Sequence, residues 1–373
     1  MFPRFVRAFT LLTSLMFTTA LAAASLSLKP LADASALSPA PLKISGRVVE
    51  TKDAADAGYR FQWPGMYFET AFSGARAAIR IGEGNAIYHV RVDDAPAIPL
   101  VKPAPGVYAL EGLSGGEHIV RVTVVSENQG GAANFGGILV PADAAARATP
   151  ALARRIEFIG DSHTVGYGNT STTRESGGDL VWRTTDNSQA FGALVAAHFG
   201  ADYQANAISG RGIVRNYNGG GGPTLPEAYP FALFDGKTPV AETGWQPHVV
   251  VIGLATNDFS TPLNPGEKWK TREELHADYE ATYVAFVQQL RARYPHAFFI
   301  LAANDMSEGE NAREVKKVAD RLIASGEKRV AFVQYPTMEL TACDWHPSLN
   351  DHRKMADTLI ELLESRPEVW SSR

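Results

Sequence analysis

Cysteine is almost absent from this sequence, which contains a single one, Cys343, among 373 residues. An intramolecular disulfide is therefore excluded. The sequence also lacks an excess of one charge, because 35 lysines and arginines against 40 aspartates and glutamates give a formal net charge of −5. This balance gives no electrostatic reason to expect nucleic acid or anionic lipid as a partner.

Patterns for metal and phosphate binding are missing as well. The nine histidines form no His-Glu-x-x-His motif or other ligand cluster, so we expect no metal and no other cofactor. The glycine run at 219–222 lacks the lysine and the following helix of a phosphate-binding loop. The oligomeric state is left open by the sequence.

The N-terminal residues have the features of an exported protein. Arg4 and Arg7 precede an apolar run over residues 8–24 that ends in small residues, which predicts a signal peptide over 1–22. An uncleaved membrane anchor is the alternative, although the run is short for spanning a bilayer. We expect a secreted or periplasmic bacterial protein that has no membrane contact once the signal is removed.

Two segments with different periodicities follow a leader, residues 23–41, whose Ala, Ser, Leu and Pro content predicts disorder. Over residues 42–141, apolar and polar side chains alternate, for example at 120–124 and 88–93. Short alternating runs separated by turn residues predict an all-β sandwich or jelly-roll domain. The alanine-rich residues 142–155 are interpreted as a linker.

Residues 156–373 predict an α/β domain. Residues 156–159 predict a short strand, and the continuous apolar runs at 249–252 and 298–301 are typical of buried parallel strands. Amphipathic helical stretches lie between these strands. This order predicts a doubly wound, flavodoxin-like parallel sheet with its ligand site at the carboxyl ends of the strands.

The candidate nucleophile is Ser162. It lies in Gly160-Asp161-Ser162, directly after the first predicted strand, where a strand-to-helix turn presents a side chain at the edge of the sheet. A plain turn or helix cap is the alternative for such residues. A Gly-x-Ser-x-Gly pattern at 112–116 lies between two strands and opens no helix, so Ser114 is not expected to act as a nucleophile.

Three further blocks give Ser162 its partners. Gly210 in block 206–212 offers a backbone donor, Asn257 offers a side-chain amide, and His346 precedes the last helix and offers a base. Together the four blocks resemble those of SGNH (GDSL) hydrolases, in the same chain order and over residues 155–367. The chemistry expected is general-base attack by Ser162 through His346, with Ser162, Gly210 and Asn257 as the oxyanion hole.

The resemblance narrows further to carbohydrate esterase family two. The residues that carry it are Gly166-Tyr167-Gly168, the stretches 209–217 and 256–260, and in the β-domain 63–67 and 116–118. It implies a jelly roll followed by an SGNH domain, and an esterase that removes O-acetyl groups from plant polysaccharides such as xylan or glucomannan. Two alternatives are an SGNH esterase acting on short-chain lipids or lysophospholipids, and a glycan-binding protein with an inert esterase domain.

The sequence departs from the usual SGNH pattern at the acid. That pattern places an aspartate three residues before the histidine, where this chain has Cys343, and Asp344 lies only two residues before His346. Either Asp344 completes a triad, or a backbone carbonyl orients the imidazole of a Ser–His dyad. Trp345 and Arg211 are candidates for substrate binding, with a pocket wall and an ion pair as their alternatives.

Overall fold

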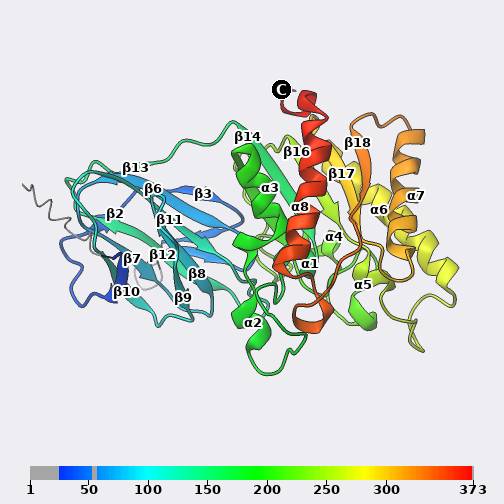
Figure 1. Ribbon diagram of the computed structural model, residues 1–373, viewed down its shortest axis with the longest axis horizontal. Helices are drawn as coiled ribbons and strands as arrows, with labels where there is room; N and C mark the ends of the chain where they lie inside the picture. Colours follow the sequence, from blue (N-terminus) through cyan, green and yellow to red (C-terminus); the bar gives the residue numbers. More distant parts are fainter. Residues whose placement is uncertain (1–24, 53–56, 372–373) are drawn as a thin grey trace, which may run out of the picture.

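The computed structural model describes residues 25–52 and 57–371, so the predicted signal peptide lies outside the described residues. Figure 1 shows a β-domain on one side and an α/β domain on the other, with the C-terminal helix lying across the latter. No helix in the described ranges is long and apolar enough to cross a membrane.

The β-domain consists of two antiparallel sheets that enclose one apolar core. The first sheet has the order β1 (Ser27–Pro30), β10 (Gly106–Glu111), β7 (Ala77–Ile81), β12 (Ala133–Val140), β5 (Gly58–Phe61) and β4 (Val49–Thr51), with β2 (Ser38–Pro39) on β12. The second has the order β13 (Arg147–Ala148), β6 (Tyr67–Ser73), β11 (Glu117–Val124), β8 (Ile87–Val92) and β9 (Ile98–Val101), with β3 (Lys43–Ser45) on β6.

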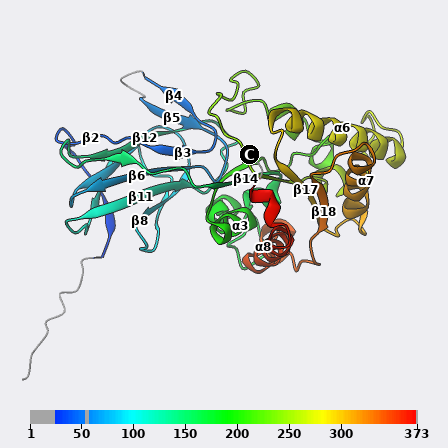
Figure 2. The same ribbon diagram turned by 90° about the horizontal axis from the view of Figure 1, so that it is seen from above.

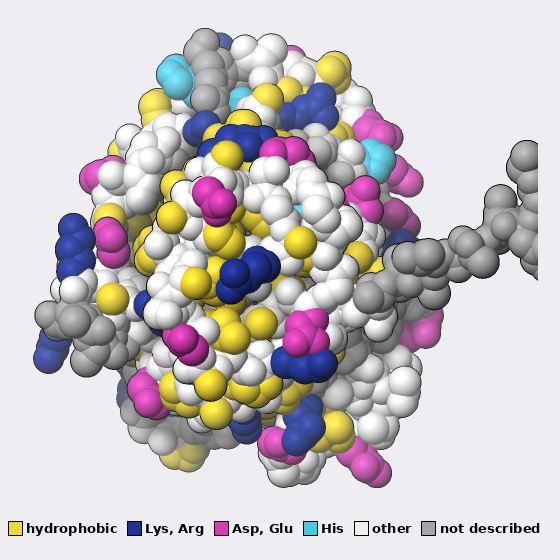
Figure 3. Space-filling model, turned by 90° about the vertical axis from the view of Figure 1, so that its left-hand side faces the viewer, with side chains coloured by type: hydrophobic (Ala, Val, Ile, Leu, Met, Phe, Trp, Pro, Cys, Tyr) yellow, Lys and Arg dark blue, Asp and Glu magenta, His cyan; other side chains and the backbone are white. Residues whose placement is uncertain are grey.

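The alternation of apolar residues explains how these sheets pack. Strands β11 and β8 pair so that Val120 faces Val92 and Val122 faces Val90, and all four side chains are buried. Successive side chains of a strand point to opposite faces, so one face of each strand enters the core. On the face of the β-domain seen in Figure 3, basic and acidic side chains are interspersed among apolar and neutral ones.

Two boundary predictions need correction. Residues 25–41 of the expected disordered leader contain β1 and β2, which pair with β10 and β12. Part of the expected linker belongs to the β-domain, because β13 pairs with β6 and Ala144 is buried in the core. Both segments add edge strands through backbone hydrogen bonds, which require little from side-chain composition.

The second domain is built on a parallel sheet with the order β15 (Ala201–Ala207), β14 (Arg154–Gly160), β16 (Val249–Gly253), β17 (Phe298–Ala303) and β18 (Val330–Gln334). This is the doubly wound order expected of a flavodoxin-like sheet. Its first strand begins at Arg154, two residues before the predicted start of the domain.

Helices cover both faces of this sheet, as the pattern predicted. Figure 2 shows α3 (Phe191–Phe199) and α8 (Leu349–Glu364) on one face, and α6 (Arg272–Arg293) and α7 (Glu310–Ala324) toward the other. Two separate apolar clusters correspond to these faces. The shorter elements are α1 (Ser162–Val165), α2 (Leu180–Thr184), α4 (Leu225–Ala228), α5 (Thr256–Phe259) and the 3-10 turns η1 (Asn187–Gln189), η2 (Tyr217–Gly219), η3 (Cys343–Trp345) and η4 (Pro367–Trp370).

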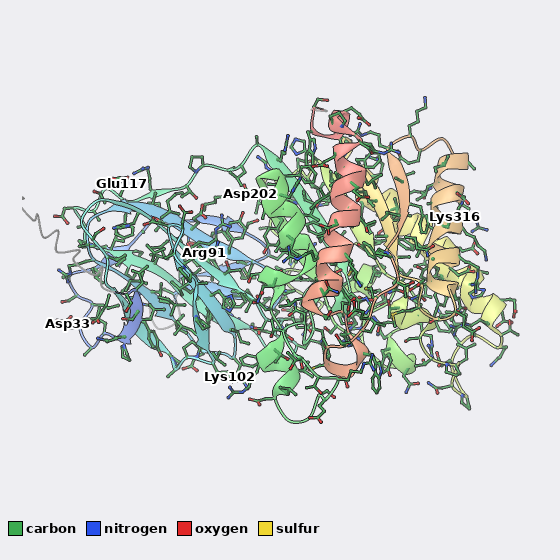
Figure 4. The ribbon with its side chains drawn as sticks, viewed as in Figure 1. Asp33, Arg91, Lys102, Glu117, Asp202 and Lys316 are labelled. Atoms are coloured by element: carbon green, nitrogen blue, oxygen red, sulfur yellow. The ribbon has the colours of Figure 1, made fainter. Side chains whose placement is uncertain are left out.

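The two domains are joined by buried polar contacts. Asp202 of β15, labelled in Figure 4, accepts a hydrogen bond from the Tyr67 hydroxyl at 2.5 Å and pairs with the Lys43 ammonium at 2.6 Å. The buried Arg47 guanidinium lies between the rings of Trp63 and Tyr229, 4.6 and 4.2 Å from their centroids. Buried, paired charges and stacked rings hold the β-domain at a defined position against the sheet.

Candidate active site

The nucleophile turn places Ser162 at the carboxyl edge of the parallel sheet. Strand β14 ends at Gly160, Asp161 caps α1 by accepting the His163 N–H at 3.0 Å, and Ser162 is the first residue of the helix. A Cβ at position 160 would lie 2.0 Å from the Thr164 hydroxyl oxygen, so only glycine fits so tight a turn. The predicted position of the serine on a strand-to-helix turn is thus confirmed.

The base meets the nucleophile directly. His346 Nε2 lies 2.9 Å from Ser162 Oγ, although the two residues are 184 positions apart in the chain. The other ring nitrogen, Nδ1, lies 3.0 Å from the Cys343 carbonyl oxygen and 3.2 Å from that of Asp344. Carbonyl oxygens only accept, so Nδ1 carries the proton and the Nε2 lone pair faces the serine hydroxyl. This is the tautomer that a general base requires.

The loop that carries the base is held by its surroundings. The Asp344 N–H donates to the Arg174 carbonyl at 3.0 Å, and the Arg174 guanidinium donates to the Leu340 carbonyl at 2.8 Å. Cys343 is a buried free thiol, and a Cβ at Gly168 would lie 2.6 Å from its Cβ. The cysteine is therefore a small packed side chain, and it contacts the turn at Gly168 that follows Ser162.

Burial lowers the pKa of the His346 imidazole below its ordinary value of 6.5, although the neighbouring carbonyls and the Asp344 charge act in the opposite direction. Desolvation disfavours the charged form of the ring. The active form of a general base is the neutral one, so activity rises as the pH rises through this pKa.

We expect the acidic limb of kcat/KM to have its midpoint below pH 6.5, measured on a soluble acetyl ester. A midpoint above that value would contradict this assignment of the imidazole's environment.

Two backbone donors of the expected oxyanion hole are free. Among the described residues, neither the Ser162 N–H nor the Gly210 N–H has a hydrogen-bond acceptor. Gly210 has a φ of 82°, a conformation that glycine adopts without strain. The Asn257 amide donates to the Arg211 carbonyl at 2.9 Å and to Asp161 Oδ2 at 3.2 Å. Asn257 is therefore held beside the nucleophile turn, and its longer bond is the weaker of the two.

Two buried aspartates shape the loops around these donors. Asp258 accepts the N–H groups of residues 213–215 at 2.9–3.0 Å, and Asp161 caps α1. Burial raises the pKa of Asp258 to about 6 and that of Asp161 to about 7, and for Asp161 the nearby Asp258 charge adds to the effect of burial.

The remaining predicted site residues lie around the base and the oxyanion loop. The Asp344 carboxylate accepts a hydrogen bond from the Tyr167 hydroxyl at 3.0 Å, and the imidazole hydrogen bonds to the Asp344 backbone carbonyl rather than to its side chain. The Trp345 side chain is 60 % exposed, so the tryptophan is not a buried pocket wall. Arg211 donates to the Gly221 carbonyl at 2.8 Å and forms no ion pair with the described carboxylates.

Comparison with known proteins decides the family. Residues 44–150 match the family described as carbohydrate esterase 2 N-terminal, and residues 158–360 match the GDSL-like lipase/acylhydrolase family. A Cellvibrio japonicus protein named acetylxylan esterase/glucomannan deacetylase is 43 % identical over 339 residues, which are 90 % of this chain and 94 % of that protein. The chain belongs to carbohydrate esterase family two.

Solved structures of family-two esterases agree with this assignment. A carbohydrate esterase whose active site is described as having divergent catalytic and non-catalytic binding functions has a TM-score of 0.85 at 42 % identity, over 89 % of this chain and all of that one. A family-two esterase from Clostridium thermocellum, solved with cellohexaose, has a TM-score of 0.75 at 26 % identity, over 89 % and 99 % of the two chains. The two-domain architecture and the enzyme class predicted from the sequence are thus confirmed.

Sequence reasoning missed two residues of this family-two esterase that contact the site. The Tyr167 ring lies 4.2 Å from the His346 ring, centroid to centroid. Glu127, from the loop after β11 of the β-domain, accepts the Ser209 N–H at 2.9 Å, next to Gly210. Tyr167 was visible as part of the glycine-flanked motif after the serine, but nothing in the sequence connects Glu127 with block 206–212.

The described residues also show how possible metal ligands are arranged. Within residues 25–52 and 57–371, no group of three or more histidine, cysteine, aspartate or glutamate side chains is arranged to hold a metal ion. His163 of the nucleophile turn and His352 of α8 are buried, which disfavours the charged form of each imidazole. Burial lowers the pKa of His352 to about 3 and that of His163 well below its ordinary value.

Proposed function

We propose that this protein is a serine esterase that removes O-acetyl groups from polysaccharides or oligosaccharides, such as acetylated xylan or glucomannan. The observation that carries the proposal is the 2.9 Å contact between His346 Nε2 and Ser162 Oγ, with two free N–H groups beside it. The Cellvibrio japonicus relative, named for both xylan and glucomannan substrates, supports the substrate class.

The reaction follows from the positions of these groups. His346 Nε2 accepts the Ser162 hydroxyl proton as Oγ attacks the acetyl carbonyl carbon. The oxygen that becomes negative is stabilised by the N–H groups of Ser162 and Gly210, and by the Asn257 amide once its bond to Asp161 is exchanged for the oxyanion. The imidazolium then protonates the departing sugar hydroxyl, which leaves an acetyl-serine. A water deprotonated by His346 hydrolyses this ester, and acetate leaves.

The two alternative functions fit the site less well. A lipid esterase needs a broad apolar acyl pocket, yet the cavity beside Tyr167 has Lys102, Asn128 and Gln129 in its walls. An inert, purely glycan-binding domain would need a lost nucleophile, base or oxyanion donor. Here Ser162 and His346 are in hydrogen-bond contact.

The proposed function is tested with two sets of substrates, nitrophenyl esters of increasing acyl length and acetylated polysaccharides. On nitrophenyl esters we expect kcat/KM to fall steeply from acetate through butyrate to octanoate, because each methylene beyond what a pocket accommodates costs about 1–3 kcal/mol. On acetylated xylan and glucomannan we expect the enzyme to release acetate, which is measured by chromatography. Rates on octanoate that match or exceed those on acetate would establish the lipid alternative instead.

We further propose that the site operates as a Ser–His dyad, with Asp344 as a structural residue. The imidazole proton is directed to backbone carbonyls, and the Asp344 carboxylate is bonded to Tyr167. We therefore expect Asp344→Asn to lower kcat less than tenfold, whereas loss of the charge in a true triad can cost about 10⁴-fold. The measurement is kcat on nitrophenyl acetate, with a thermal melt to verify folding. A loss of a thousandfold or more would restore Asp344 to the catalytic set.

Three features predicted from the sequence stay proposals. The β-domain is proposed to be a jelly roll, which is supported by the two four-stranded sets β10-β7-β12-β5 and β6-β11-β8-β9. Trp345 and Arg211 are proposed to contact substrate, since the first is exposed beside the base and the second flanks Gly210. Export to the periplasm or the medium is proposed from residues 1–22.

A further inference from the structure

A large cavity lies between the β-domain and α2. Its volume is about 570 Å³, within the range of clefts that hold small-molecule ligands. One wall comes from β-domain loops, which include Asn85, Lys102 and residues 127–132, and the other from Tyr167 and residues of α2 with Val181 and Trp182. The cavity is therefore an interdomain cleft, the kind of place where ligand sites concentrate.

Two residues in the walls of this cleft contact the proposed catalytic loops. The ring of Tyr167 is tilted by 32° against the His346 ring, with the ring centroids 4.2 Å apart. Glu127, on the opposite wall, accepts the Ser209 N–H at 2.9 Å, one residue before the proposed oxyanion donor Gly210. A molecule in the cleft would consequently touch residues that themselves contact the base and the oxyanion loop.

The walls of the cleft combine an aromatic ring with glycines that leave open space. Trp182 is partly buried and lines the cleft, and an aromatic ring is the kind of side chain that contacts one face of a sugar. A Cβ at Gly130 or Gly131, in the other wall, would meet nothing within 4 Å. The space in front of these two glycines is consequently open to a ligand, and the Gly131 N–H donates to the Asn128 carbonyl at 3.4 Å. An apolar ring with a few polar groups is the usual composition of a specific ligand site.

The charged groups of the cleft already have partners. The Lys102 ammonium lies 4.2 Å from the Trp182 ring centroid and 3.9 Å from the Asp179 carboxylate. Figure 4 shows Lys102 at the edge of the β-domain that faces α2. Glu127 is bonded to the backbone of Ser209, as described above. With both charges engaged, the cleft favours a neutral, hydroxyl-rich ligand over an acidic one.

We propose that this cleft is a binding subsite for the neutral sugar units that flank the acetylated unit, with Trp182 as its stacking platform and the β-domain loops as its second wall. The inference rests on the proposed esterase function and specifies it further. The β-domain is then part of the substrate-binding surface, and the enzyme distinguishes a polysaccharide chain from a small acetyl ester by contacts made outside the reacting centre.

The test compares a polymer with a small ester in the full-length enzyme. We expect Trp182→Ala to lower kcat/KM on acetylated glucomannan about tenfold, mainly through KM, because truncation of an aromatic side chain that contacts the ligand removes binding energy. Activity on nitrophenyl acetate, which is too small to reach the cleft, should stay within twofold. Trp182→Tyr keeps a ring and should recover most of the activity on polymer.

Binding supplies a second measurement. In the Ser162→Ala background, calorimetric titration with mannohexaose should show a dissociation constant about tenfold higher when Trp182→Ala is added. Lys102→Ala should change the affinity for the same sugar more than Lys316→Ala, a matched control on α7 that Figure 4 shows at the far end of the molecule.

Each outcome separates the two proposals. If the wild-type enzyme releases acetate from glucomannan and Trp182→Ala does so equally well, the subsite is wrong and the esterase function stands. Equal losses on polymer and on nitrophenyl acetate would also overturn the subsite, since Trp182 would then act on the catalytic loops. A wild-type enzyme that deacetylates no glycan would overturn the proposed function itself.

Discussion

Replacing Ser162 by alanine is expected to lower kcat on nitrophenyl acetate by about 10⁴–10⁶-fold, the range seen when a serine hydrolase loses its nucleophile. The hydroxyl oxygen lies 2.9 Å from His346 Nε2, and its loss removes the atom that would carry the acetyl group in the proposed intermediate. The residual rate would come from the oxyanion donors, which remain in place. The measurement is the initial rate at saturating substrate.

The control for this change is another serine in a motif that resembles a nucleophile. Ser114→Ala alters the Gly-x-Ser-x-Gly pattern of the β-domain and should leave the rate within twofold. The Ser162→Ala protein should melt near the wild-type temperature, because within the described part of the chain the Ser162 hydroxyl has no hydrogen-bond partner other than His346. A folded variant with wild-type turnover would remove Ser162 from the mechanism.

Replacing Asn257 by alanine is expected to lower kcat about 10²–10³-fold with little change in KM, as for the loss of one oxyanion donor. The amide lies between the Arg211 carbonyl and Asp161, both within 3.2 Å, so it is oriented before substrate arrives. Pre-orientation of this kind stabilises the transition state more than the bound substrate, which is why the effect should appear in kcat.

The interpretation of this variant depends on its stability. The alanine also removes two hydrogen bonds that are buried or partly buried, a loss of about 1 kcal/mol each, so a modestly lower melting temperature is expected. Asn350→Ala, on the exposed surface of α8, is the matched control and should affect neither quantity. A large rise in KM with unchanged kcat would show that Asn257 binds ground-state substrate and is not an oxyanion donor.

Local motifs in the sequence were sufficient to predict that Ser162 and His346, the proposed catalytic pair, lie in contact. A serine directly after a buried strand and a histidine directly before the last helix both had to lie at the carboxyl edge of one parallel sheet, because that is where the strands end. Periodicity also separated the two domains, since periods of two and of 3.6 residues require different secondary structures. These features depend only on residues that are near one another in the chain.

Contacts between distant segments were decided by the tertiary structure alone. The strands β1 and β2 form because existing sheet edges offer hydrogen-bond partners, which composition cannot reveal. The orientation of the imidazole depends on the left-handed turn at Asp344, whose φ of 50° directs the carboxylate to Tyr167. Glu127 reaches block 206–212 across the domain interface. The sequence determined which side chains meet at the edge of the sheet, and three-dimensional packing decided what holds them, because each supporting contact joins residues that no local pattern relates.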